Sequence, residues 1–196
     1  VLFDLDGTLA DTAPDLAGAL NHVLTQYGHE PLPYESIRPH VSHGGAALVT
    51  LGFGKDHPEF DLYYKELLDY YQSNIANETR LFPGMNELLI ELEASGMNWG
   101  VVTNKPAWLT NPLMQALNLT SRAISIVSGD TLEQRKPHPA PILHACEQAG
   151  SLANECLYVG DAARDIEAGN AAGMLSIVAL FGYIAESDAP DTWGAY

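Results

Sequence analysis

Five short apolar runs recur along the chain, and within each run the apolar residues are continuous rather than alternating with polar ones. Continuous runs rich in β-branched residues are typical of parallel strands that are buried on both faces of a sheet. We therefore predict strands in VLFDL (1–5), WGVVT (99–103), AISIVS (123–128), CLYVG (156–160) and LSIVAL (175–180).

Amphipathic segments between the later runs predict helices. The segment 85–96 places Leu88, Leu89 and Leu92 on one helical face and ends at a glycine. Further segments that read as helices are 111–119, 140–150 and 164–173. Because strands that alternate with helices along a chain form a parallel sheet, we predict an α/β fold with a doubly wound, Rossmann-like, five-stranded core.

The segment 13–81 departs from this alternation, since it contains helical patterns and no clear strand. Its longest helical stretches are 13–28 and 60–76, and the tyrosines of the second stretch indicate packing against other helices. We expect 13–81 to be an α-helical cap domain inserted into a core made of residues 1–12 and 82–196.

Composition narrows the classes of partner. The formal net charge is −16, with only nine lysines and arginines. This charge argues against binding to nucleic acid or to an anionic membrane, but a bound cation can reverse the potential locally for a small anionic substrate. No apolar run approaches the ~18 residues that span a bilayer. The two cysteines, Cys146 and Cys156, have no metal-binding spacing and predict reduced, packed thiols.

These features lead us to expect a soluble cytoplasmic protein, monomeric or homodimeric. The chain begins at Val1, inside an apolar run and without a methionine, and it ends abruptly at Tyr196. We therefore expect a few further residues before Val1.

Charged and polar side chains follow the first predicted strand, at the sheet edge where open α/β sheets bind their ligands. Asp4 and Asp6 are two residues apart, so in an extended chain they point the same way. Gly7 then allows a sharp turn and Thr8 offers a hydroxyl. An Asp-Gly pair alone is more often a simple turn, and the interpretation therefore depends on the other strand ends.

The other strand ends and the loops after them carry a hydroxyl, an amide, two ammonium groups and two carboxylates: Thr103, Asn104, Lys105, Lys136, Asp161 and Asp165. Carboxylates that converge repel one another unless a cation or a shared proton holds them together. Carboxylate oxygens together with a substrate phosphate are the usual environment of Mg²⁺ in proteins. We therefore expect the aspartates to face a metal ion and a phosphate.

The chain resembles the haloacid dehalogenase superfamily of phosphatases through four motifs in matching order and spacing: DLDGT (4–8), Thr103, Lys136 and GDAARD (160–165). The resemblance covers essentially the whole chain and includes a helical cap inserted after the first motif. Within the superfamily, VTNKP (102–106) and RKPHP (135–139) look most like the phosphoglycolate phosphatase group.

The resemblance implies a role for each motif residue. Asp4 is the expected nucleophile, which forms an aspartyl-phosphate, and Asp6 is the expected general acid and then the base that activates water. Thr103 and the backbone N–H of Asn104 hold the phosphoryl oxygens, and Lys136 offsets negative charge on the phosphate and the nucleophile.

The same resemblance implies a Mg²⁺ site. Its expected ligands are the Asp4 carboxylate, the Asp6 backbone carbonyl and Asp161. Asp165 is expected to orient waters or Lys136.

A cap of this kind typically closes over the site and contacts the part of the substrate beyond the phosphate. Its segment 38–48 supplies Ser42, His43 and Gly44 as candidate substrate contacts, and Arg38 as a candidate partner for a substrate carboxylate. Thr8 and Asn104 are the candidate contacts from the core.

Two substrates are left open by the sequence, and each carries a carboxylate. One is 2-phosphoglycolate. The other is N-acetylmuramic acid 6-phosphate, because VSHGGAALV, WGVVTNKP and GYIAESDAPDTWGA resemble the bacterial phosphatases of that bulkier sugar phosphate.

Other classes fit less well. Haloalkanoic acid dehalogenases lack the second aspartate, so Asp6 argues against them. A phosphonatase needs a cap lysine, and neither Lys55 nor Lys65 is suitably placed. A hexose-phosphate mutase uses the same Asp4 and Asp6 and is not excluded, whereas a binding module without catalysis would lack one or more of the motif residues.

Overall fold

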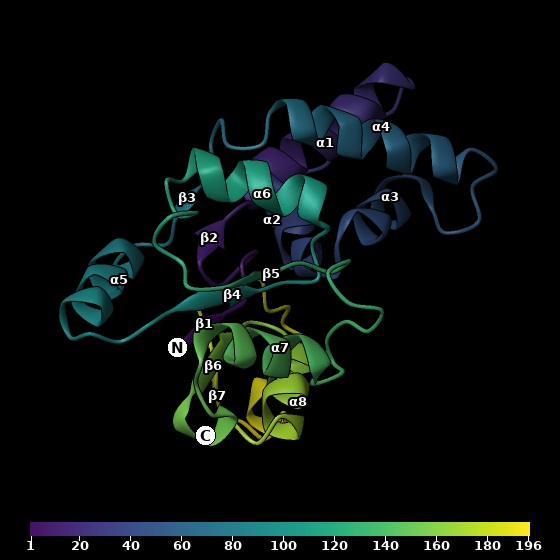
Figure 1. Cartoon of the computed structure of the whole chain (residues 1–196). Helices are drawn as coiled ribbons and strands as arrows, with labels where there is room; N and C mark the ends of the chain where they lie inside the picture. The colour runs from purple at the N-terminus through teal and green to yellow at the C-terminus, as the bar shows by residue number, and fades with distance from the viewer.

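The computed structural model describes all 196 residues, which form a five-stranded parallel sheet flanked by helices, with a layer of further helices beyond it (Figure 1). The strand order is β5-β4-β1-β6-β7, and every neighbouring pair is parallel. The strands are β1 (Leu2–Phe3), β4 (Gly100–Val102), β5 (Ile126–Val127), β6 (Leu157–Gly160) and β7 (Leu175–Val178). The predicted α/β architecture is confirmed.

Each strand is shorter than the apolar run that predicted it, but the hydrogen-bond ladder continues into the residues that follow. The backbone N–H of Asp4 donates to the Val159 carbonyl at 2.8 Å, and the N–H of Thr103 donates to the Val127 carbonyl at 2.9 Å. The sheet therefore fixes the backbone of the first polar residue after β1 and after β4.

Both faces of the sheet are buried at its centre, which explains why the apolar runs there are continuous, whereas the edge strand β7 leaves Leu175 and Ile177 exposed. Leu2 and Val102 pack with Ile142 and Ala168, which belong to the helices α7 (Ala140–Ala149) and α8 (Ala163–Ala171). Their chain neighbours Phe3 and Val101 belong to a separate, larger cluster. That cluster also includes residues of α5 (Met85–Ala94) and α6 (Ala107–Ala116).

Two details of the predicted helices were wrong. In α5 the buried residues are Met85, Leu89 and Leu92, whereas Leu88 is 41% exposed. The helix α6 begins at Ala107 rather than at residue 111, directly after Pro106. Proline is compatible with the start of a helix because its fixed φ suits the first turn.

The helical layer is formed by α1 (Ala13–Gln26), α2 (Tyr34–Ile37), the 3-10 helix η1 (Arg38–His43), α3 (Gly45–Phe53) and α4 (Phe60–Ser73). The helix α1 packs against both α3 and α4. Tyr63 and Tyr71 of α4 are buried in this packing, but Tyr64 is 37% exposed, so only part of the tyrosine-rich face is interior.

A second, two-stranded sheet joins the helical layer to the core. The strand β2 (Ala10–Asp11) pairs antiparallel with β3 (Arg80–Leu81), so the chain leaves and re-enters the core at one place. The prediction that 13–81 contains no strand was wrong at its last two residues. We keep 13–81 as the proposed limits of the cap.

Neither cysteine forms a disulfide: Cys146 and Cys156 are free thiols, as predicted. None of the helices has the length and apolar character that crossing a membrane would need.

Candidate active site

Three buried carboxylates meet at the carboxyl edge of the sheet. Asp4 follows β1, Asp161 follows β6, and Asp165 lies in the first turn of α8. One oxygen from each lies within 4.8 Å of the others, and each residue is at most 3% exposed. The structure therefore brings together three of the carboxylates that the sequence predicted to converge.

Lys136 is buried against this group. Its Nζ lies 2.9 Å from Asp4 Oδ1 and 2.7 Å from Asp165 Oδ1, and it also donates to the Tyr158 hydroxyl at 2.8 Å. Tyr158 in turn donates to the Val102 carbonyl, which anchors the arrangement to β4. Burial alone would lower the pKa of Lys136, but Asp165 and Asp4 raise it above its ordinary value. Lys136 therefore stays charged.

Asp161 is held by groups from three parts of the chain. Its carboxylate accepts hydrogen bonds from the Tyr183 backbone N–H at 2.8 Å, from Ser42 Oγ at 2.7 Å and from Thr8 Oγ1 at 3.4 Å. Gly7, at φ +83°, turns the chain beside it, and a Cβ on Gly7 would collide with the carboxylate. The Asp-Gly pair of the first motif thus makes room for Asp161.

Burial raises the pKa of both Asp4 and Asp161. The pKa of Asp4 rises to about 7, mainly because burial disfavours the carboxylate, although Lys136 opposes the shift. Burial likewise raises the pKa of Asp161. A cation near these oxygens would favour their charged forms, and an all-oxygen donor set suits a hard divalent cation such as Mg²⁺. The residues present therefore fit such an ion.

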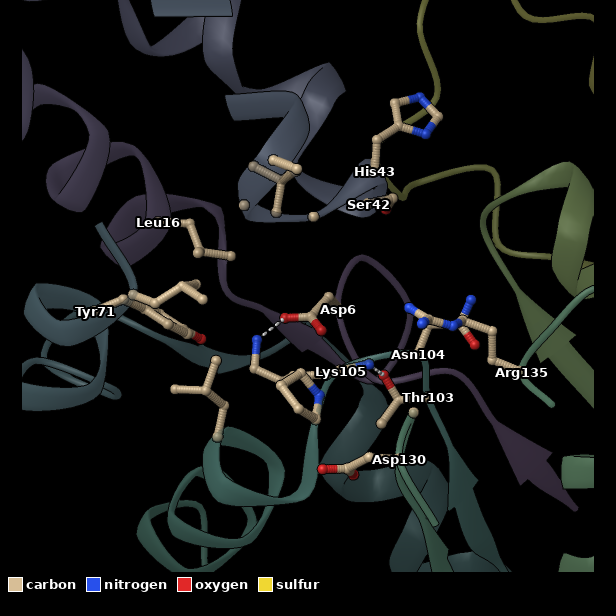
Figure 2. Close-up of a pocket in the computed structure, with 18 of the residues that line it drawn as sticks. Asp6, Leu16, Ser42, His43, Tyr71, Thr103, Asn104, Lys105, Asp130 and Arg135 are labelled. Carbon is tan, nitrogen blue, oxygen red and sulfur yellow. Dashed lines mark hydrogen bonds and ion pairs between the residues drawn. The ribbon is translucent and has the colours of Figure 1, made fainter. Parts of the chain in front are cut away.

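Asp6 has different partners from the three clustered carboxylates. Its Oδ1 lies 2.7 Å from Lys105 Nζ and accepts a hydrogen bond from Thr12 Oγ1 at 2.6 Å. The Lys105 ammonium also lies 4.6 Å from the centre of the Tyr71 ring, which comes from α4 of the cap. Figure 2 shows Lys105 between Asp6 and Tyr71. Sequence reasoning placed the lysine at the strand end but gave it no role.

Thr103 and Asn104 lie on the same edge. Thr103 Oγ1 accepts a hydrogen bond from the Lys105 backbone N–H at 3.1 Å. The Asn104 side chain both donates to and accepts from the backbone of Lys136, at 2.9 Å and 3.1 Å. Asn104 thereby connects the loop after β4 to the loop that carries Lys136.

A cavity of about 630 Å³ opens between this edge and the cap, and Asp4, Asp6, Thr103 and Asn104 line it. Ser42, His43 and Gly44 line it from the cap side, and they are three of the four cap residues that the sequence predicted. Figure 2 shows Ser42 and His43 across the cavity from Asp6.

Arg38 and Thr8 are not among the residues that line the cavity. The Arg38 guanidinium donates to the backbone carbonyls of Gly182 and Phe181 at 3.0 and 2.9 Å, and it lies over the Tyr183 ring. Arg38 therefore connects the cap to the C-terminal segment.

Two other arginines line the cavity. Arg135 immediately precedes Lys136, and Arg164 immediately precedes Asp165. Arg164 donates from Nη2 to the Ser42 carbonyl at 2.6 Å. Burial and the neighbouring Arg164 lower the pKa of His43, which favours its neutral form. Both arginines are direct chain neighbours of motif residues, and this proximity is the sequence signal that points to them.

Comparison with known proteins agrees with this geometry. Residues 1–179 match the haloacid dehalogenase-like hydrolases. A phosphoglycolate phosphatase of Xylella fastidiosa is 42% identical, over all of this chain and 86% of its own length. An N-acetylmuramic acid 6-phosphate phosphatase of Pseudomonas aeruginosa is 41% identical, over all of this chain and 87% of its own length.

A solved structure is also similar. The crystal structure of a predicted phosphoglycolate phosphatase from Haemophilus somnus superposes with a TM-score of 0.84 at 30% identity, and the match covers 94% of this chain and 86% of that one. The chain belongs to the haloacid dehalogenase-like hydrolase family. It is an enzyme, and within that family it is a phosphatase.

Proposed function

We propose that this phosphatase hydrolyses small phosphate monoesters in two steps, with the phosphoryl group carried in between by Asp4. The observation that carries the proposal is the position of the Asp4 carboxylate. It lines the cavity, lies beside Lys136, and is the first residue after the central strand β1. A carboxylate held there can attack a phosphorus atom that enters from the cavity.

The surrounding residues supply the remaining chemistry of the proposal. In the first step an Asp4 oxygen bonds to phosphorus, the ester P–O bond breaks, and Asp6 gives a proton to the departing oxygen. In the second step Asp6 takes a proton from the water that attacks phosphorus and frees Asp4. Lys136, the Thr103 hydroxyl and the Asn104 N–H stabilise the charge on the phosphoryl oxygens.

We assign Asp4, Asp161 and the backbone carbonyl of Asp6 as the residues that would hold Mg²⁺. The ion would offset the charge of the phosphoryl group and of the carboxylates around it. Asp165 already pairs with Lys136 and accepts the Ala162 N–H at 3.0 Å, so we assign it to orienting the lysine.

The cavity indicates which esters fit. Its volume of about 630 Å³ lies within the range of drug-sized ligand pockets and exceeds what a two-carbon ester such as phosphoglycolate fills. Tyr64 and Trp108 line it, are partly exposed, and offer apolar faces to a larger group. Arg135 and Arg164 offer charge to a second anionic group. These features favour a carboxylated sugar phosphate of the N-acetylmuramic acid 6-phosphate type, with phosphoglycolate as the smaller alternative.

Phosphate release from a panel of esters tests this proposal. We expect kcat/KM for N-acetylmuramic acid 6-phosphate to exceed that for phosphoglycolate and for glucose 6-phosphate by about tenfold or more, equivalent to about 1.4 kcal/mol. Asp4→Asn should release no phosphate from any of them, because the amide is not a nucleophile.

Equal rates across the panel would contradict the substrate assignment alone. Normal turnover by Asp4→Asn would contradict the covalent mechanism. Transfer of the phosphoryl group to a second sugar position, without net phosphate release, would identify a mutase instead.

A further inference from the structure

The pairing of Lys105 with Asp6 has no counterpart in the four sequence motifs. The ion pair is largely shielded from solvent, with side-chain exposures of 7% for Lys105 and 14% for Asp6. Asp6 lines the cavity, but its carboxylate is not part of the cluster formed by Asp4, Asp161 and Asp165. Lys105 therefore acts on a different carboxylate from the two that Lys136 contacts, those of Asp4 and Asp165.

Lys105 is held at several points, so its ammonium has little freedom. Its backbone N–H donates to Thr103 Oγ1 at 3.1 Å, and its carbonyl accepts from the Gly129 N–H at 2.8 Å and from Thr110 Oγ1 at 3.1 Å. At the other end of the side chain, the ammonium lies over the ring of Tyr71, which is fully buried.

The contact with Tyr71 links the two parts of the molecule. Lys105 and Asp6 both follow strands of the core, whereas Tyr71 belongs to α4 of the cap. Cation–π contacts strengthen when the cation is shielded from water, as this one is. The cap therefore helps to fix the position of a cation whose other partner is Asp6.

We propose that Lys105 is a positioning residue that orients the Asp6 carboxyl group toward the departing oxygen of the substrate, with Tyr71 holding Lys105 in place from the cap. This inference rests on the proposed function, in which Asp6 gives its proton to that oxygen as the P–O bond breaks and the Asp4–phosphorus bond forms. Thr12 Oγ1, at 2.6 Å from the same Asp6 oxygen, supplies the second fixed contact. Orientation of this kind governs how well a general acid serves its reaction.

Two esters of similar size separate this role from a direct contact with phosphate. Benzyl phosphate releases an alkoxide that requires a proton, whereas 4-nitrophenyl phosphate releases a stable phenolate that hardly requires one. The ratio kcat/KM reports the steps up to the first irreversible P–O cleavage, so it reports this proton transfer. Lys105→Met removes the ammonium and keeps an unbranched apolar stem.

We expect Lys105→Met to lower kcat/KM for benzyl phosphate by about tenfold or more and that for 4-nitrophenyl phosphate by less than about threefold. Lys105→Arg should restore much of the benzyl phosphate rate, because a guanidinium also donates to a carboxylate and the cavity beside residue 105 has room for it. If Lys105→Met does not fold, the same ratio measured for Tyr71→Leu carries the test, with a selective loss of benzyl phosphate activity expected.

Equal losses for both esters would overturn the inference, since they would indicate that Lys105 binds the phosphate or only supports the fold. Lys65→Met is the matched control, because Lys65 lies on the same cap helix as Tyr71 and its ion pair with Asp69 is exposed. We expect this control to keep wild-type rates with both esters.

Asp6→Asn and the double variant distinguish failure of this inference from failure of the proposed function. If Asp6 is the acid, Asp6→Asn shows the same selective loss, and adding Lys105→Met causes no further selective loss. If Asp6→Asn lowers both rates equally, the acid role of Asp6 fails and this inference fails with it. If Asp6→Asn is selective but Lys105→Met is not, only the role of Lys105 fails.

Discussion

The Asp4 carboxylate is buried beside two other carboxylates, and Lys136 is its ion-pair partner. Such burial favours the protonated form of Asp4, although attack on phosphorus requires the charged form. The fold therefore holds the proposed nucleophile in surroundings that a cation would make more favourable.

This burial predicts how stability depends on pH in the protein without metal. Asp4 loses its proton near 3.8 in the unfolded chain but only at about 7 in the folded state. Between these values the folded state binds a proton that the unfolded state has lost, so the contribution of Asp4 to the free energy of unfolding falls as pH rises from about 4 to about 7.

Asp4→Asn provides the comparison, because an amide does not titrate. Relative to wild type, we expect its free energy of unfolding to increase across this window by at most about 1.4 kcal/mol per pH unit. Urea unfolding of both proteins in chelator at several pH values measures the difference. A difference that stays constant with pH would contradict the account of Asp4.

Residue-scale reasoning from sequence placed the motif residues on the correct edge of the sheet. It did not find the partner of Asp6, because that pairing joins residues 99 positions apart and depends on side-chain direction. It also assigned Arg38 to the substrate, whereas Arg38 contacts the backbone at Phe181 and Gly182. Residue type alone does not show which way a long side chain extends.

At the scale of helices and strands, the buried side chain of Asp15 joins the start of α1 to the segment directly before β3, where the chain returns to the core. Asp15, in the first turn of α1, accepts hydrogen bonds from the backbone N–H groups of Glu78 and Thr79 at 3.1 and 2.9 Å, and from Thr79 Oγ1 at 2.7 Å. Asp15 is only 6% exposed. It therefore fixes the junction where β2 and β3 pair.

Removing this carboxylate should weaken the fold at the junction. We expect Asp15→Ala to lower the free energy of unfolding by about 2 to 3 kcal/mol, because it leaves buried backbone donors without partners. The control is Asp61→Ala, because Asp61 also lies in the first turn of a helix, α4, but is exposed. This variant should change stability by less than about 0.5 kcal/mol. Urea unfolding that shows equal stability for the two variants would contradict this role.

Helices and strands were predicted correctly where the hydrophobic pattern extends over several consecutive residues. The strands of the five-stranded sheet lie within the predicted segments, and the helices α5, α6, α7 and α8 that flank it overlap the predicted helices. The strand β3 was missed because it has only two residues, one of them the exposed Arg80. Two residues are too few to show a hydrophobic pattern. The helix predicted for 111–119 begins earlier, at Ala107, and Pro112 lies in its interior.

At the scale of the whole molecule, an acidic chain acts on a phosphate ester, which is also negatively charged. The positions of its few lysines and arginines therefore matter. Lys105, Arg135 and Arg164 are three of only nine lysines and arginines, and all three line the cavity. The composition could show that the chain is acidic, but only the fold shows that a third of its lysines and arginines gather at the cavity, beside the carboxylates of Asp4, Asp6 and Asp130. These cations offset the charge of the carboxylates around the cavity, although the net charge of the chain is −16.

The central claim is that Asp4 carries the phosphoryl group, and rapid acid quenching during turnover tests it most directly. Peptide mass spectrometry of the quenched enzyme should find a phosphoryl group on the peptide that contains Asp4. The adduct should be labile to hydroxylamine, as acyl phosphates are, and absent from Asp4→Asn. An unmodified Asp4 peptide in wild-type enzyme that is releasing phosphate, together with continued phosphate release by Asp4→Asn, would contradict the account.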